Sequence, residues 1–410
     1  MKIIESCDVV VIGAGAAGLM CACQAAQNGR SVIVLDANRQ AGRKLRLTGK
    51  GRCNLTNNCS VKEFMENIPG DGRFLYSALN RFSPDDVIAF FENAGVPLKT
   101  ERGNRVFPVS DHADDIADCL LRLCTAAGVQ FLKTRADSVL TEDGHVTGVH
   151  TAEGVLACTS AILCTGGLSY PLTGSDGTGY RIAKTLGHTV TELHPSLVPL
   201  VSDDWYCAEM QGFSLKNVQL SAYEDDALIF RELGEMLFTH FGVSGPLVLS
   251  ASAHMRNFAQ KKYRLAIDLK TGLTDEKLDE KLLREFAAAS NKTIKNIMPG
   301  LIGKSLAPVI LSLADVPEDT PVNLITHEQR MAIKNLMKSF PISITGTRSV
   351  DEAIITAGGV NTKEVNPRTM ESKITQGLYF AGEILDVDAY TGGFNLQIAW
   401  STGYVAGNSV

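Results

Sequence analysis

Three glycines and one aspartate near the start of the chain have the types and spacing of a nucleotide-binding motif. Gly13, Gly15 and Gly18 form a GxGxxG sequence after an apolar run, and Asp36 ends the next apolar run. The first glycine permits a tight turn, the second lets the backbone approach a pyrophosphate, and the third lets a helix pack closely on a strand. The helix N-terminus attracts the phosphates, and the acid accepts ribose hydroxyls. Because an aspartate repels a 2′-phosphate, we expect FAD or NAD rather than NADP.

A basic, glycine-rich segment follows this motif directly. Three glycines, three arginines and two lysines lie among residues 42–53. A solvated surface loop is one interpretation of this composition. We favour another, an irregular loop that wraps a bound anion with backbone N–H and guanidinium groups, because the segment comes so soon after the acid of the nucleotide motif.

A third group of residues with possible chemistry lies near the C-terminus. The apolar run 378–380 leads through Ala381 and Gly382 to Glu383, and a helix is predicted to begin near Asn395. Ligands bind at the carboxyl ends of strands in an open α/β sheet, where a glutamate can accept hydrogen bonds from polyol hydroxyls. The helix N-terminus would favour the negative charge that a reduced flavin carries around N1 and O2. A capped helix that only packs on the sheet is the alternative.

Taken together, the GxGxxG motif with its acid and the distant run 377–383 resemble an FAD-binding flavoprotein of the glutathione-reductase-like superfamily. The sequence contains no second GxGxxG motif. Three segments are also similar to the BaiN-type, aminoacetone oxidase-like family of FAD-dependent oxidoreductases, namely residues 42–57, 238–246 and 381–397. Lys50 departs from the pattern, because we expect asparagine or another residue there in relatives.

The resemblance implies a non-covalent FAD and a set of residues that hold it. The first motif and Asp36 would bind the ADP half, and the segment 43–54 would line the pyrophosphate and the ring. Residues 382–396 would hold the ribityl chain and the pyrimidine end. No metal site is expected. The cofactor-binding residues that we expect are Gly13, Gly15, Ala16, Ala17, Gly18, Asp36, Ala37, Arg43, Lys44, Gly51, Arg52, Asn54, Thr165, Gly166, Gly382, Glu383, Gly393, Asn395 and Leu396.

The resemblance also implies hydride chemistry at flavin N5, for which the protein supplies orientation and electrostatics. We expect an FAD-dependent oxidoreductase that reduces a conjugated carbon–carbon double bond in an enone, steroid or bile-acid-like substrate. Because the chain has a single dinucleotide motif, NAD(P)H would be a transient co-substrate at the flavin. Oxidation of a small amine such as aminoacetone by O₂ is an alternative. A flavin-binding sensor without turnover is a second alternative.

Three residues come into question as proton donors, and none is assigned that role. His240, Cys53 and Tyr390 each lie in a motif expected near the flavin. For His240 we favour a histidine satisfied by hydrogen bonds at a domain boundary. Tyr390 lies in a polar turn and could equally cap a helix, and Cys53 has no CxxC partner, which argues against a redox disulfide. The catalytic residues therefore stay unknown.

The elements that must position these residues change in type along the chain. Apolar runs followed by glycine turns recur at 161–167 and 353–360, as in a parallel Rossmann-like sheet. Between them lie alternating strands and a helical stretch. We therefore expect an α/β fold with a discontinuous Rossmann-like FAD-binding domain (1–190 and 346–410), an inserted β-rich domain (191–272 and 318–345) and a small helical subdomain (273–317).

Composition limits the classes to which the chain can belong. Its 410 residues are 45% hydrophobic and 20% charged, with a net charge of −6. This balance argues against a nucleic-acid partner, and hence against a tRNA-modifying flavoprotein. Ten cysteines without zinc or disulfide spacing fit a reducing cytoplasm, and no apolar run reaches membrane-spanning length. We expect a cytoplasmic enzyme with a small-molecule substrate, no nucleic-acid or membrane partner, and an unknown oligomeric state.

One competing enzyme class is excluded by spacing and length. Tyr180 and Lys184 lie four residues apart on a predicted helix, as the catalytic pair of a short-chain dehydrogenase does. That class also requires a separate serine and has a much shorter chain. We therefore do not assign the pair a catalytic role.

Overall fold

The chain folds into two compact units. The computed structural model describes residues 3–410, so the predicted domain start at residue 1 lies outside the described residues. One unit, here called the nucleotide unit, runs to Ser196 and resumes at Val350, and the other, the insert unit, is Leu197–Ser349. The domain limits that the sequence predicts, at 190 and 346, fall close to these boundaries.

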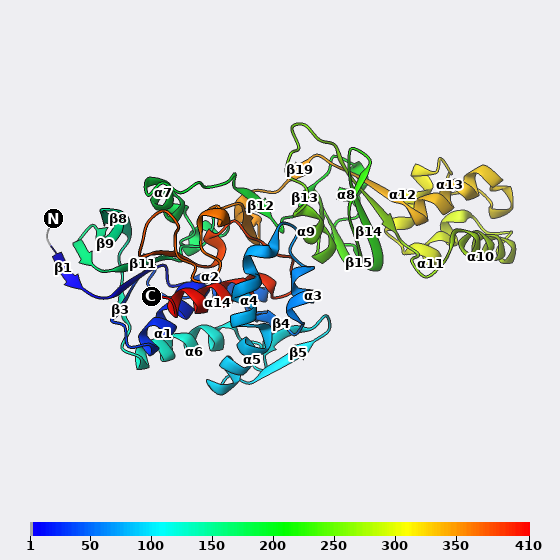
Figure 1. Ribbon diagram of the computed structural model, residues 1–410. Helices are drawn as coiled ribbons and strands as arrows, with labels where there is room; N and C mark the ends of the chain where they lie inside the picture. Colours follow the sequence, from blue (N-terminus) through cyan, green and yellow to red (C-terminus); the bar gives the residue numbers. More distant parts are fainter. Residues whose placement is uncertain (1–2) are drawn as a thin grey trace. The chain divides into compact units, whose positions relative to one another are not determined.

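A five-stranded parallel sheet forms the centre of the nucleotide unit (Figure 1). All of its neighbouring strands are parallel, and the two strands of the GxGxxG motif are buried along their whole length, as expected for a sheet covered on both faces. The Rossmann-like α/β fold is therefore confirmed. In spatial order the strands are β21 (Leu378–Phe380), β11 (Ser160–Leu163), β2 (Val9–Ile12), β3 (Val32–Leu35) and β7 (Gln130–Leu132).

Two helices from opposite ends of the chain pack tightly together on this sheet (Figure 1). They are α1 (Ala16–Gln27) and α14 (Phe394–Gly407). A Cβ atom at Gly403 would lie 2.7 Å from the backbone oxygen of Ala17, and one at Gly407 would lie 2.5 Å from that of Cys21. The close approach therefore requires glycine at both positions of α14.

Smaller elements of the nucleotide unit surround this centre. A four-stranded sheet has the order β1-β10-β9-β8, and a three-stranded sheet has the order β4-β6-β5. Their bounds are β1 Ile3–Ser6, β4 Thr56–Asn57, β5 Leu98–Glu101, β6 Arg105–Pro108, β8 Ala136–Glu142, β9 His145–Thr151 and β10 Gly154–Ala157, with β12 His194–Ser196 pairing β20 Ile355–Ala357. The remaining α-helices are α3 Val61–Met65, α4 Tyr76–Arg81, α5 Pro84–Asn93, α6 Ala113–Ala126 and α7 Thr178–Thr185.

The basic segment after β3 is a broken helix and not the irregular loop that its composition predicts. Helix α2 spans Arg43–Gly51 and starts after Gly42, which has a φ of +70°. Leu45 is buried and anchors the first turn. The helix breaks where Thr48 is extended and Gly49 and Lys50 have positive φ. One apolar anchor in nine residues is too weak a pattern for a helix prediction.

The insert unit contains a seven-stranded antiparallel sheet with the order β18-β17-β14-β15-β16-β13-β19. Its elements are β13 Leu200–Val201, α8 Trp205–Glu209, β14 Ser214–Glu224, β15 Ala227–Thr239, β16 Gly242–Ser244, α9 Pro246–Ser252, β17 Tyr263–Asp268, α10 Asp275–Ala288, α11 Met298–Ile302, α12 Leu306–Leu313, α13 His327–Lys338, β18 Phe340–Ile344 and β19 Gly346–Thr347.

Helix α13 lies with α10–α12 in one helical cluster (Figure 1). An ion pair between Arg330 and Asp279, 2.8 Å apart, joins α13 to α10. The helical cluster thus includes residues that the predicted subdomain of 273–317 leaves out.

Within residues 3–410, no single helix combines the length and apolarity that crossing a bilayer requires. The pieces Ile294–Ile302 and Leu306–Leu313 reach those values only as a pair, across a bend of 118°.

Candidate functional site

The turn between β2 and α1 has the geometry of a pyrophosphate-binding loop. Gly13 has a φ of +106°, and a Cβ atom there would lie 2.5 Å from the backbone oxygen of Cys164. At Gly18 a Cβ atom would lie 1.8 Å from the backbone oxygen of Gly13, whereas at Gly15 it would meet no atom within 4 Å. Ala16 and Ala17 then open α1, which has no side-chain cap and no acid in its first turn. Open space and free N–H groups therefore coincide where a phosphate is expected.

Asp36 is fixed against this turn by two backbone donors. Its Oδ2 atom accepts a hydrogen bond from the N–H of Ala14 at 2.8 Å, and its Oδ1 atom accepts one from Asn38 at 2.7 Å. A carboxylate oxygen can accept more than one hydrogen bond, so this geometry leaves capacity for ribose hydroxyls. Ala37 is exposed beside it, and the exposed Arg43 reaches the side-chain oxygen of Asn38 at 3.3 Å.

Lys44 and Glu383 form a largely buried ion pair between segments that are far apart in sequence. The Nζ atom of Lys44 lies 2.6 Å from Oε2 of Glu383, and the two side chains are 24% and 15% exposed. Lys44 also donates to the hydroxyl of Ser169 at 2.6 Å, and that hydroxyl donates to Glu383 at 3.0 Å. The N–H of Thr356 adds a further donor to Glu383 at 3.0 Å.

The structure gives the Glu383 carboxylate protein partners that the sequence did not indicate. The prediction that it accepts hydrogen bonds from a polyol stays a prediction, since its carboxylate already has three protein donors. Ser169 has no signal in the sequence, because it belongs to none of the motifs described above. Tyr180 lies beside the cluster, and burial, with the charges of Glu383 and Asp386, raises the pKa of its hydroxyl far above the usual value. Tyr180 is therefore held as a neutral phenol.

Two predicted residues follow β11 at the same edge of the sheet. Gly166 has a φ of +72° and faces the hydroxyl of Ser175. Thr165 packs under α7, where a Cβ atom at Gly179 would lie 2.0 Å from its Oγ1 atom. Both residues stay half-buried, and their contact with a cofactor stays a prediction.

The N-terminus of α14 is built by an unusually close backbone contact. Gly393 has a φ of +99°, and a Cβ atom there would lie 2.4 Å from the backbone oxygen of Thr56. No side chain caps this end of the helix. Asn395 uses its amide on both backbone groups of Ala389, at 2.9 and 2.7 Å, while Leu396 is half-buried. Asn395 therefore shapes the turn before the helix. The Gly382 position is also tight, because a Cβ atom there would lie 2.8 Å from the side chain of Ala17.

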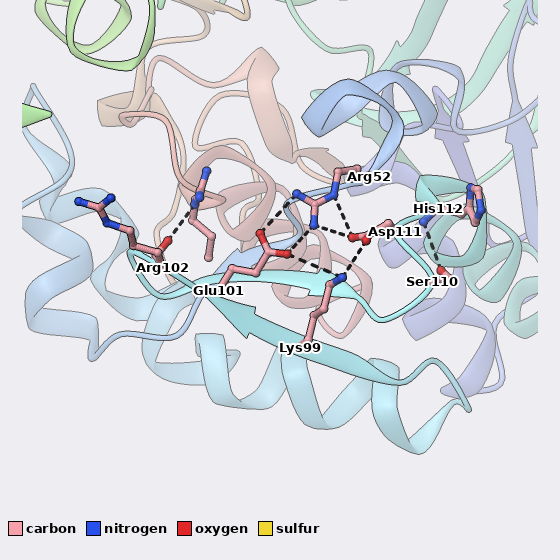
Figure 2. A network of polar contacts seen from close by, with 8 residues as sticks. Arg52, Lys99, Glu101, Arg102, Ser110, Asp111 and His112 are labelled. Carbon is pink, nitrogen blue, oxygen red and sulfur yellow. Dashed lines mark hydrogen bonds and ion pairs between the residues drawn. The ribbon is translucent and has the colours of Figure 1, made fainter. Parts of the chain in front are cut away.

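Arg52 is held in a network of four charged side chains (Figure 2). Its guanidinium contacts Glu101 and Asp111 at 2.5 Å each, and Lys99 lies 2.8 Å from Asp111. The guanidinium also lies 4.2 Å from the centre of the Phe107 ring. Hydrogen bonding to Arg52 lowers the pKa of Glu101, and hydrogen bonding to Lys99 and then Arg52 lowers that of Asp111. In the structure this guanidinium pairs with protein carboxylates, and its predicted contact with a cofactor stays a prediction.

Asn54 presents a buried oxygen that nothing satisfies. Its Oδ1 atom has no hydrogen-bond partner, although Leu55 and Thr56 beside it are tied to α14. Trp400 donates to the backbone oxygen of Leu55 at 2.9 Å, and the Thr56 hydroxyl lies 2.6 Å from the amide oxygen of Gln397. Gly51, which precedes this stretch, has open space around it. The open space at Gly15 and the uncapped start of α1 both fit a bound FAD.

The three candidate proton donors lie in different settings. Burial raises the pKa of the Cys53 thiol to about 12, so it is a neutral thiol and a poor nucleophile. His240 is exposed in the insert unit, with its ring edge-on to Phe241 at 5.0 Å. Tyr390 donates its backbone N–H to Asn67 at 2.9 Å. None of these contacts assigns a catalytic role.

Comparison with known proteins agrees with this geometry. The model of the family described as "HI0933-like protein Rossmann domain" matches residues 7–409. The chain is 32% identical to "Ribosomal RNA dihydrouridine synthase" of Escherichia coli over 98% of this chain and 97% of that protein. It is 30% identical to "3-dehydro-bile acid delta(4,6)-reductase" of Clostridium scindens over 97% of this chain and 98% of that protein.

Solved structures share the fold at low sequence identity. A 3-ketosteroid-Δ4-(5α)-dehydrogenase from Rhodococcus jostii has a TM-score of 0.53 at 16% identity, covering 100% of this chain and 97% of its own. A flavocytochrome c3 fumarate reductase has a TM-score of 0.51 at 16% identity, covering 100% and 78%. Because the family model matches residues 7–409 and the relatives of 30% and 32% identity span nearly the whole chain, the predicted family resemblance is confirmed: the chain belongs to the HI0933-like family and is an FAD-dependent oxidoreductase.

Proposed function

We propose that this protein reduces a carbon–carbon double bond conjugated to a carbonyl, with hydride delivered from FAD. The observation that carries the proposal is the chemistry shared by two kinds of relative. A Δ4,6-reductase of a 3-dehydro bile acid acts on double bonds conjugated to a ketone, and dihydrouridine is uridine whose C5=C6 bond, conjugated to C4=O, has been reduced. In both cases the carbonyl stabilises the charge that hydride addition creates.

The residues of the nucleotide unit would divide the work of holding the cofactor. Gly13, Gly15 and Gly18 would receive the pyrophosphate, and Asp36 the ribose. Lys44 would balance the charge of Glu383 so that this acid can lie close to an anionic cofactor. When bound, FAD supplies hydride chemistry at its N5 atom. We assign no residue as the proton donor.

The electron source in this proposal is NAD(P)H, which would visit the flavin transiently. What supports this is that the sequence has one GxGxxG motif and therefore offers one dinucleotide site of this type. An anaerobic mixture of the yellow protein with NADH or NADPH tests this step. Bleaching of the flavin is expected with at least one of them, and bleaching by a primary amine alone would favour the amine oxidase.

A uridine in RNA is a second candidate substrate, and two relatives at 32% identity favour it. The prediction that no nucleic acid binds rested on the acidic net charge. The insert unit holds 17 Lys and Arg against 18 Asp and Glu, so it has no basic excess for phosphate contacts. For this reason we rank the small conjugated ketone first.

One experiment separates these candidates. The reduced holoprotein is mixed anaerobically with a 4-en-3-one steroid, with ribosomal RNA lacking dihydrouridine, or with buffer, and flavin reoxidation is followed. Reoxidation by the steroid with a saturated product supports the proposal. Reoxidation by RNA alone would show that uridine, and not the ketone, is the substrate. If neither compound reoxidises the flavin and amines do not reduce it, the protein is a flavin-binding sensor without turnover.

A further inference from the structure

The turn between β5 and β6 carries two exposed arginines, Arg102 and Arg105. Within the described residues 3–410 neither guanidinium forms an ion pair, because the two acids of this region, Glu101 and Asp111, pair with Arg52 and Lys99 instead. Figure 2 shows the Arg102 guanidinium pointing away from that network. The two side chains are therefore free to bind an anion from outside the chain.

The backbone of this turn is fixed, because each of its three carbonyl oxygens accepts a hydrogen bond. The bonds run from Nε of Arg105 to Arg102 at 3.0 Å, from the side-chain amide of Asn57 to Gly103 at 3.0 Å and from the N–H of Asn58 to Asn104 at 2.7 Å. The turn is thus ordered before any ligand arrives, which reduces the entropy that binding would cost.

The surface around the turn has an excess of positive charge, although the whole chain has a net charge of −6. Residues 49–58 and 98–111 together hold five Lys and Arg against two Asp and Glu. Arg105 lies over the Phe107 ring at 5.8 Å, and a Cβ atom at Gly49 would lie 3.7 Å from the same ring. The exposed Lys50 follows Gly49 directly. A local positive surface of this kind attracts anions.

The turn lies at the ring end of the proposed cofactor site. The side-chain amide of Asn57 donates to the backbone oxygen of Gly103 at 3.0 Å and to that of Gly392 at 3.1 Å. Gly392 directly precedes Gly393, the residue that starts α14. An anion held by the turn would therefore lie beside the end of α14 at which we propose the flavin ring, and not beside Asp36.

The reactant that fits this surface carries phosphates, which arginine binds through two parallel N–H groups. A conjugated ketone has no phosphate, and the glycine turn after β2 is available for those of FAD. NADH carries a diphosphate, and NADPH carries one phosphate more. We propose that Arg102 and Arg105, with Lys50 beside them, bind the phosphates of NAD(P)H while its nicotinamide visits the flavin. This inference rests on the electron source proposed above and not on the identity of the substrate.

The test measures binding to the FAD-loaded protein by calorimetry. Tetrahydro-NADH and tetrahydro-NADPH serve as probes, because they keep the phosphates but cannot donate a hydride. The wild-type chain is expected to bind at least one of them, and to bind it more weakly as salt is added. Replacing both arginines, Arg102→Gln with Arg105→Gln, should raise the dissociation constant about tenfold. Arg102→Lys with Arg105→Lys should lose less, because the charges remain and only the paired N–H groups are lost.

The controls separate phosphate binding from general damage. Arg368→Gln removes another exposed arginine of the nucleotide unit and should leave the dissociation constants unchanged. Reduced nicotinamide riboside donates the same hydride but has no phosphate, so it should bleach the flavin equally fast in the wild-type chain and the double variant. If the double variant does not fold or loses FAD, Arg102→Gln alone gives the answer, since this guanidinium has no partner among the described residues.

Three results would overturn the inference. They are equal dissociation constants in the wild-type chain and the folded glutamine variants, no binding of either probe to the wild-type chain, and slower bleaching by the riboside in the double variant. An effect of the substitutions on a short RNA but not on the probes would also overturn it, because the arginines would then serve RNA phosphates. A failure of enone reduction would leave the dissociation constants of the probes untouched.

Discussion

The two ends of the proposed cofactor site are built in opposite ways. The adenine end comes from a single βαβ unit. In it, Gly18 packs against the backbone oxygen of Gly13, and Asp36 accepts a hydrogen bond from the N–H of Ala14. The ring end is assembled from pieces that are distant in sequence, with Lys44 and Glu383 separated by 339 residues. Local backbone sterics therefore govern the first end, whereas long-range polar contacts govern the second.

The largest effect is expected from glycines of the adenine end. A Cβ atom at Gly18 would collide with the Gly13 backbone, but at Gly15 it would enter open space. Gly18→Ala should therefore lower the free energy of unfolding by more than about 4 kcal/mol. Gly15→Ala should leave it nearly unchanged and weaken FAD binding by at least about tenfold. Urea unfolding and FAD titration measure the two quantities, and equal loss of stability in both variants would contradict the steric account.

The Lys44–Glu383 pair should give the next largest effect. Lys44→Met or Glu383→Gln alone leaves a mostly buried group without its partner, which costs roughly 2–3 kcal/mol. The double variant should cost clearly less than the sum of the two, because each group is harmful only when the other is left alone. The matched control is the exposed pair Lys295–Asp319, whose removal should have no measurable effect. Additive losses at Lys44 and Glu383 would show that the pair does not hold the ring end together.

The Arg52 network should make a smaller and pH-dependent contribution. Both Glu101 and Asp111 have a lowered pKa in the folded chain, so the stabilisation is present above the ordinary carboxylate pKa of about 4 and is lost as the pH falls through the folded value. Arg52→Met should lower stability and FAD affinity at neutral pH, and its deficit in stability should shrink on acidification.

Arg105→Met is the matched control for Arg52. The Arg105 guanidinium lies over the same Phe107 ring at 5.8 Å, and its Nε atom donates to the backbone oxygen of Arg102. Arg105→Met should leave the pH dependence of the free energy of unfolding at acidic pH the same as in the wild-type chain. If both variants show the same pH dependence, the carboxylate pairing of Arg52 does not position the turn.

The smallest effect is expected at Lys50. This exposed residue has a φ of +59°, which glycine adopts without strain. Lys50→Gly should therefore raise the free energy of unfolding by up to about 1 kcal/mol. The same change at Lys62, an exposed position inside helix α3, should lower it by about 1 kcal/mol. Destabilisation at both positions would mean that the Lys50 conformation carries no strain.

The parts that sequence predicts are those whose causes are local. The order of strand, glycine turn, helix and strand from Val9 to Leu35 follows from apolar runs and glycine spacing, and the structure confirms it. The run at 161–167 forms β11 in the parallel sheet, as predicted. The run at 353–360 does not join that sheet, because its strand β20 pairs antiparallel with β12.

What sequence did not predict depends on side chains that meet across long separations. Composition predicts a loop where helix α2 forms, because basic residues and glycines make up six of its nine residues and Leu45 is its one buried residue. The ion pairs of Arg52 have no signal in the sequence, because its carboxylate partners lie 49 and 59 residues further along the chain, outside any motif. Ser169 lacked a signal of its own, and only the fold brings it to Lys44.

The most direct test of a cofactor held at two independent ends is a titration of the apoprotein with FAD, FMN and ADP. FAD joins both ends in one molecule, so the account predicts that it binds at least about a hundredfold tighter than either fragment. FMN binding as tightly as FAD would show that the glycine motif and Asp36 contribute nothing, and failure of FAD itself to bind would contradict the account as a whole.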